Sequence, residues 1–148
     1  MAVSNPQYQQ ATLNATAELN LLKTALNAAG AKARLFKSTF APTPASVEAD
    51  FVAAEADYSG YAAQQPVFVG PFLDAAGVPF LEMTDLAFSN TTGVVGNVLG
   101  GMWLENAAGA LYGYVPFIGP LTLNAAGSAF TVDVRFSSFR GGAADVVS

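Results

Sequence analysis

The spacing of apolar residues changes once along the chain, at Gly30. Before that point apolar residues recur every three or four positions, which predicts a helix over residues 6–29. Pro6 suits the first helical position, where its missing N–H costs nothing, and Gly30 suits the end. The apolar positions of this helix are Leu13, Ala17, Leu19, Leu22, Leu26 and Ala29. After Gly30 the period becomes two over residues 31–37, which predicts β structure from there onward.

A turn sequence, Asn or Asp followed by Ala-Ala-Gly, occurs four times, at 27–30, 74–77, 106–109 and 124–127. The Asn or Asp side chain accepts backbone N–H groups ahead of it, and the glycine supplies a positive φ. The first copy ends the helix, and the other three predict hairpins that place Gly77, Gly109 and Gly127 in the left-handed region. The expected strands are 66–73 with 78–88, 94–105 with 110–117, and 119–123 with 128–136.

Three successive hairpins predict a mainly β fold, an antiparallel β-sandwich or barrel (jelly-roll-like) preceded by one N-terminal helix. We expect an N-terminal helical segment at 1–30, a β-domain at 31–140 and a flexible tail at 141–148. The expected core positions are Phe68, Phe72, Phe80, Phe88, Trp103, Tyr112, Tyr114, Phe117, Phe130, Val132, Val134 and Phe136. No stretch is apolar enough for a membrane span, and the first 20 residues lack a secretory pattern.

Charge is scarce and unevenly placed. Charged residues are 11% of the chain and apolar residues 52%. Four of the six basic residues precede position 38, whereas residues 38–134 hold nine carboxylates and no Lys or Arg. An acidic body repels phosphates, so we expect no nucleic-acid partner. The candidate partner contacts are Lys23, Lys32, Arg34, Lys37 and Trp103, although a solvated helix face and a core indole are the simpler interpretations.

The residue inventory excludes much chemistry. The chain has no cysteine and no histidine, so thiol catalysis, His-based triads and Cys/His zinc sites are absent. The acidic residues in 46–61 lack the spacing of a calcium loop and are expected as solvated surface charge. Asp85 with Glu105 is the best available carboxylate pair for hydrolysis, and we do not expect catalysis there. No cofactor, no metal and no enzymatic activity are expected.

Two stretches carry a family resemblance. Residues 33–44 (ARLFKSTFAPTP) followed by 53–61 (AAEADYSGY) resemble a family of small virion proteins of tailed bacteriophages. The similarity extends to the glycine-rich strand 100–104, the 106–109 turn and the Leu-Thr-Leu run at 121–123. It implies a component of a phage particle and supplies no catalytic residues.

Together these observations predict a structural virion protein, first of all a capsid decoration (cement) protein on the particle surface. Its expected partners are the major capsid protein or neighbouring virion proteins, and we expect a homo-oligomer. The alternatives are a tail, tail-tip or head-fibre component, and a carbohydrate-binding β-module. A chain with so few charges has apolar surface that assembly would cover.

Overall fold

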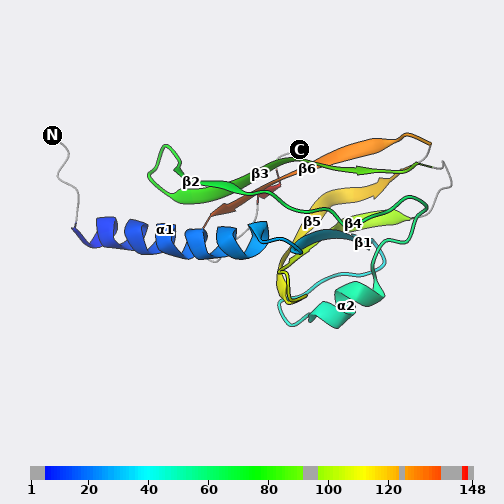
Figure 1. The fold of residues 1–148 in the computed structure, drawn as a ribbon, viewed down its shortest axis with the longest axis horizontal. Coiled ribbons are helices and arrows are strands. Elements are labelled where there is room, and N and C mark those ends of the chain that lie inside the picture. The colour runs from blue at the N-terminus through cyan, green and yellow to red at the C-terminus, as the bar shows by residue number, and fades with distance from the viewer. Residues whose placement is uncertain (1–5, 92–96, 124–125, 138–144, 147–148) are drawn as a thin grey trace.

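The computed structural model describes residues 6–91, 97–123, 126–137 and 145–146, with the side chains of the first helix from Ala15 onward. Nine elements follow one another (Figure 1): α1 (Pro6–Asn27), β1 (Lys32–Lys37), α2 (Glu48–Ala53), β2 (Val69–Leu73), β3 (Pro79–Ser89), β4 (Val98–Glu105), β5 (Leu111–Thr122), β6 (Ala129–Ser137) and β7 (Asp145–Val146). The tail expected at residues 141–148 contains β7 at positions 145 and 146. Its other six residues lie outside the described residues.

The strands form two antiparallel sheets, one with the order β1-β4-β5 and one with the order β2-β3-β6-β7. Their facing sides share one core, in which Leu35 and Met102 of the three-stranded sheet join Leu81, Met83 and Val134 of the four-stranded sheet. This architecture confirms the expected mainly β sandwich. Alternating side chains bury one face of each strand, so a period of two in the sequence leads directly to this packing.

Helix α1 covers the inner face of the four-stranded sheet beyond the end of the three-stranded one (Figure 1). Leu19 and Leu26 belong to the same core as the sheets, so the helix and the sandwich form one packed unit. Asn27 fixes the helix end by exchanging two hydrogen bonds with the backbone of Phe68, at 2.8 and 2.7 Å. The helix therefore ends at Asn27, two residues before the predicted end, and Gly30 follows with φ 94°.

Two of the three predicted hairpins are confirmed. Asp74 Oδ1 accepts the N–H groups of Ala76 and Val78 between β2 and β3, and Asn106 Oδ1 does the same for the turn between β4 and β5. Gly77 and Gly109 close these turns with φ of 76° and 82°. The side-chain oxygen of the first turn residue and the positive φ of the last act as the sequence predicted.

The third predicted hairpin is wrong. The expected strands 110–117 and 119–123 form the single strand β5, which pairs with β4, while β6 pairs with β3 in the other sheet. Gly127 has the predicted positive φ, 79°, but lies in a connection between the sheets, where its N–H donates to the Asn90 carbonyl at 2.7 Å. An edge strand leaves part of its backbone without a strand partner, so β5 tolerates the Gly-Pro pair at 119–120 that we expected to break it.

Candidate interaction surfaces

A polar network occupies the edge of β1, where the sequence predicted cationic contact residues. Arg34 bridges two carboxylates, with Nη1 2.8 Å from Glu55 Oε1 and Nε 2.8 Å from Glu105 Oε1. Lys37 Nζ lies 2.9 Å from Asp57 Oδ2. Two of the four predicted cations therefore neutralise acidic side chains of their own chain, and two of the carboxylates expected as solvated charge, Glu55 and Asp57, are their partners.

The network holds residues 54–64, which we call the strap, along the outer edge of β1. Backbone bonds join Lys37 N to the Ala54 carbonyl, Ala56 N to the Leu35 carbonyl and Ala33 N to the Gln64 carbonyl, at 2.8, 2.9 and 2.7 Å. The Tyr61 hydroxyl donates to Glu55 Oε1 and accepts the Leu35 N–H. The strap thus occupies a strand edge that an open sheet would present to another chain.

Ionisation follows from these contacts. Burial opposes the charged form of Arg34, but its bonds to Glu55 and Glu105 outweigh burial and raise the pKa of the guanidinium. The hydrogen bond from Lys37, with a second from Asn97, lowers the pKa of the exposed Asp57 carboxyl. Burial raises the pKa of the Tyr61 phenol, which stays a neutral donor to Glu55. These contacts therefore favour the charged forms of Arg34 and Asp57 and the neutral form of Tyr61.

The remaining predicted contact residues lie apart. Lys23 Nζ donates to the Gly70 carbonyl and so links α1 to β2. Lys32, at the start of β1, is exposed. Trp103 of β4 is 0% exposed, so its indole presents no surface to a partner. The structure therefore leaves Lys32 as the solvent-facing member of the predicted set.

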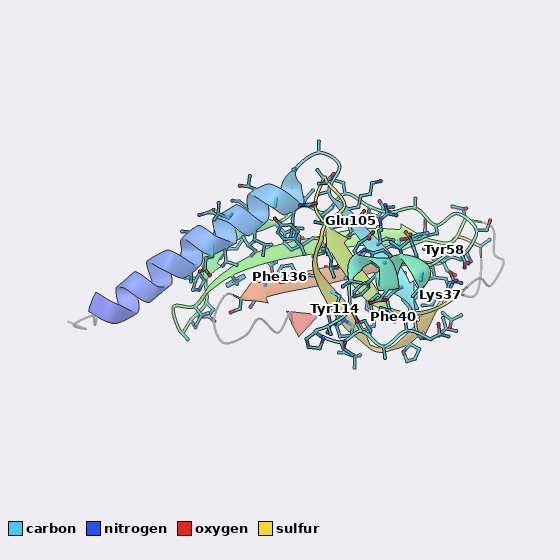
Figure 2. All side chains as sticks on the ribbon, turned by 90° about the horizontal axis from the view of Figure 1, so that it is seen from below. Lys37, Phe40, Tyr58, Glu105, Tyr114 and Phe136 are labelled. Carbon is cyan, nitrogen blue, oxygen red and sulfur yellow. The ribbon has the colours of Figure 1, made fainter. Side chains whose placement is uncertain are left out.

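Trp103 instead belongs to a second aromatic cluster on the outer face of the three-stranded sheet. Helix α2 covers it with Phe51, which is fully buried and lies 5.6 Å from Trp103, 5.6 Å from Phe36 and 5.5 Å from Tyr114, measured between ring centroids. Figure 2 shows α2 above this face, with Phe40 and Tyr114 beside it. Both faces of this sheet are thus covered, and its central strand β4 is buried nearly throughout.

Exposed apolar side chains that the sequence did not predict at the surface lie on both edge strands, β2 and β5. Four lie in or just before β2, with Phe72 and Leu73 on opposite faces of the strand, and we call them the β2 patch: Val67, Val69, Phe72 and Leu73. The second place is Ile118 of β5, which is 93% exposed and flanked by an apolar groove of about 240 Å³ lined in part by Phe117, Leu121 and Phe130. The sequence holds a signal for both exposed sites. Bulky apolar residues stand beside the Gly-Pro pairs at 70–71 and 119–120, and proline in a strand indicates a position at the edge of a sheet.

Two expected core positions are corrected by these surfaces. Phe72 and Tyr112 are each 45% exposed, because they lie on the edge strands β2 and β5, which have a neighbouring strand on one side. Phe68, Phe88, Trp103, Val132 and Val134 are buried as predicted. Edge position, which alternation alone does not encode, decides the difference.

The described residues offer no assembled reaction centre. Asp85 lies on β3 and Glu105 on β4, in different sheets, and Glu105 is already paired with Arg34. Within the same described ranges no three Asp or Glu side chains gather as metal ligands, and neither α1 nor α2 is long and apolar enough to cross a membrane. Surfaces, rather than a pocket with reactive groups, are the notable features.

No known protein-family model, curated protein or solved structure matches the chain. A functional proposal therefore rests on the fold, on the two apolar surfaces and on the sequence motifs.

Proposed function

We propose that this protein is a structural virion protein of a tailed phage, a capsid decoration protein that binds and stabilises the shell through protein–protein contacts. The observation that carries the proposal is the pair of exposed apolar surfaces, the β2 patch and the Ile118 region, on a tightly packed sandwich. Monomeric soluble proteins expose few contiguous apolar patches, and such patches mark interaction sites. The phage-like motifs at 33–44 and 53–61 point to the same role.

The first turns of α1 supply a second docking element. In both views they extend beyond the sheets that cover the rest of the helix (Figures 1 and 2). Further along the helix, beyond these first turns, Leu21 is 74% exposed on the solvent side. A projecting helix is suited to reach a groove or valley between capsid subunits, with an apolar face against the partner.

Contacts with the shell are mainly apolar and polar under this proposal. Arg34 and Lys37 already bind carboxylates of their own chain, and Lys23 binds the Gly70 carbonyl. Lys32 is the predicted cation that faces solvent. We therefore expect binding to depend weakly on salt, because screening acts on exposed charges and leaves apolar burial intact.

The test is to add the purified protein to particles whose own copy of the gene has been deleted. Wild-type protein is expected to bind full and empty shells to a fixed ratio relative to the major capsid protein, measured by mass spectrometry, and to raise the temperature at which shells open. Binding to tails alone would replace the decoration role with the tail alternative. Binding to neither would overturn the proposal.

A matched pair of variants tests the helix. Leu21→Asp on α1 is expected to weaken shell binding about tenfold or more, because a charge is placed in a desolvated contact. Val52→Asp, at an exposed apolar site on α2, serves as the control and is expected to bind as wild type does. Equal binding by both variants would exclude the surface of α1 around Leu21 from the docking surface.

A further inference from the structure

The apolar groove of about 240 Å³ beside Ile118 lies between β5 of one sheet and β6 of the other, and we call it the β6 groove (Figure 1). Four consecutive residues of β6, 130–133, line one of its walls. Successive side chains of a strand point to opposite faces, so four in a row line a groove only where it follows the edge of the strand. The β6 groove therefore runs along a strand edge.

Hydrogen bonding shows which backbone groups face this edge. The Asn90 N–H donates to the Ser128 carbonyl at 2.9 Å, so Ser128 faces β3. The register of β6 with β3 then continues without a shift through residue 132, and residues of such a ladder face their two sides alternately. Thr131 therefore faces away from β3. On that side β7 pairs with β6 only at residues 134 and 135, and no described strand pairs with Thr131.

The other wall of the β6 groove is a ridge of β5. The register with β4 breaks between Pro116 and Leu121, so residues 117–120 stand out of the ladder. Ile118 of this ridge is 93% exposed, so this wall is open to solvent. Phe117 and Phe130 contribute to an apolar lining on the two sides. A strand that enters the groove can pair with the backbone of β6 and bury alternate side chains against this lining.

The charged side chain that lines the β6 groove is a carboxylate. Asp133 accepts the Asp85 N–H at 2.7 Å, and no described Lys or Arg pairs with it. Asp85 adds a second carboxyl-bearing residue beside it. The next cation along β6, Arg135, is bonded to Glu82. The rim of the groove is therefore acidic, and a strand that carries Lys or Arg complements it.

A second copy of this chain fits the β6 groove poorly. Residues 38–134 contain both walls and carry nine carboxylates with no Lys or Arg, so two grooves brought together would place acidic rims against each other. Arg34 and Lys37 of β1 are bonded to carboxylates of their own chain. Lys32 belongs to the same strand, which already has β4 on one side and the strap on the other. The fitting strand therefore belongs to another protein.

We propose that the edge of β6 at Thr131 binds an extended segment of a neighbouring virion protein by strand addition, with alternate apolar side chains in the β6 groove and a Lys or Arg beside Asp133. Main-chain hydrogen bonds supply affinity in this mode, and the pockets for alternate side chains select the sequence. The inference deepens the proposed function and rests on it for the source of the segment. The binding site itself is tested with purified protein.

The probe is a short blocked peptide that alternates valine with threonine and carries lysine in place of one threonine. Its binding is followed by NMR through the backbone amide of Thr131. Methylation of the peptide nitrogens that face β6 removes the donors for strand pairing and is expected to weaken binding at least about tenfold. A peptide with glutamate in place of lysine is also expected to bind more weakly, because it brings a like charge to Asp133.

Two substitutions at one position test the backbone contact. Thr131→Pro removes the outward N–H and leaves the bonds to β3, since proline is tolerated where the N–H of an edge faces solvent. It is expected to weaken peptide binding at least about tenfold, whereas Thr131→Ala keeps the N–H and is expected to bind as wild type does. Thermal unfolding checks that both variants are folded. If the proline variant does not fold, the methylated peptide decides the same question.

Charge reversal tests the choice of partner. Asp133→Lys is expected to reverse the preference, so that the glutamate peptide binds better than the lysine peptide. Glu18→Lys makes the same charge change at an exposed site on α1 and is expected to keep the wild-type preference.

Wild-type protein that binds neither peptide, or Thr131→Pro that binds as Thr131→Ala does, would overturn the inference. Self-association that the proline variant alone loses in sedimentation velocity would overturn it in favour of a second copy. A proline variant that loses the peptide but binds particles normally would also overturn it, because the segment would not belong to the shell. Particles that bind no wild-type protein would overturn the proposed function and leave the peptide result standing.

Discussion

At the scale of single residues, glycine serves two different physical needs in this chain. Gly109 stands in a turn with φ 82°, and a Cβ added there would meet nothing within 4 Å. Gly101 has no positive φ, but a Cβ there would overlap the Phe36 ring and lie 2.5 Å from the Val115 carbonyl oxygen. The turn sequence predicted the first role, whereas the second depends on a contact between strands that no local pattern reveals.

Substitution separates these two roles. Gly109→Val is expected to cost about 1–2 kcal/mol in free energy of unfolding because a branched side chain is strained at positive φ. Gly101→Ala is expected to cost about 1–3 kcal/mol because the backbone oxygen of Val115 cannot easily give way. Gly113→Ala, with open space and no positive φ, is the control. Urea denaturation measures all three, and a Gly101 variant as stable as the Gly113 variant would contradict the packing argument.

The pKa of the Asp57 carboxyl is expected to depend on its contact with Lys37. Its pKa lies below the ordinary 3.8, first because of the hydrogen bond from Lys37. A carboxyl whose pKa is lowered by folding contributes stability above its unfolded pKa and loses that contribution as the pH falls through its folded pKa. Lys37→Met is therefore expected to raise the pKa of Asp57, followed by carboxyl chemical shifts in NMR. Lys32→Met should leave it unchanged; an unshifted Asp57 in the Lys37 variant would disprove the coupling.

At the scale of elements, sequence patterns predicted those helices and hairpins that depend on residues close together in the chain. Helical spacing, Pro6 and the turn at 27–30 specified α1, and the turns at 74–77 and 106–109 specified two hairpins. The pairing of β6 with β3 across the intervening β4 and β5 was missed, because the third turn sequence is compatible with a connection between sheets as well as with a hairpin. The strap was missed for a different reason, because Arg34 meets Glu55, 21 residues away in the sequence, only after the chain has folded.

Helix α2 is short, and packing rather than helix propensity holds it in place. Its buried Phe51 contacts four aromatic rings, among them that of the sole tryptophan, Trp103. Phe51→Ala is expected to cost about 3–5 kcal/mol and to increase acrylamide quenching of Trp103 fluorescence, because the cavity loosens the cover over the indole. Val52→Ala, on the exposed side of the helix, should change neither quantity. Unchanged quenching in the Phe51 variant would mean that α2 does not shield Trp103.

At the scale of the whole molecule, burial and charge together explain why a small chain with few ionic groups presents defined surfaces. The three-stranded sheet has the common core on one side and the α2 cluster on the other, whereas the described residues place a core on the inner side alone of the four-stranded sheet. Most cations near β1 are used inside the chain, so the solvent-facing surface combines neutral, apolar and acidic parts. Composition shows that charge is scarce, whereas the three-dimensional arrangement shows which described apolar side chains are exposed.

Helix α1 is expected to be necessary for folding of the whole sandwich. The helix contributes Leu19 and Leu26 to the common core, and Asn27 binds the backbone before β2. Deleting residues 1–30 removes these groups and exposes the inner side of β3, so cooperative thermal unfolding should be lost. Deleting residues 1–13 keeps every described core residue of the helix, and the melting temperature should fall by only a few degrees. Circular dichroism distinguishes the two outcomes. If both deletions melted like the full chain, α1 would be an appendage rather than part of the core; if the shorter deletion folded but no longer bound particles, the projecting turns would be the part that meets the shell.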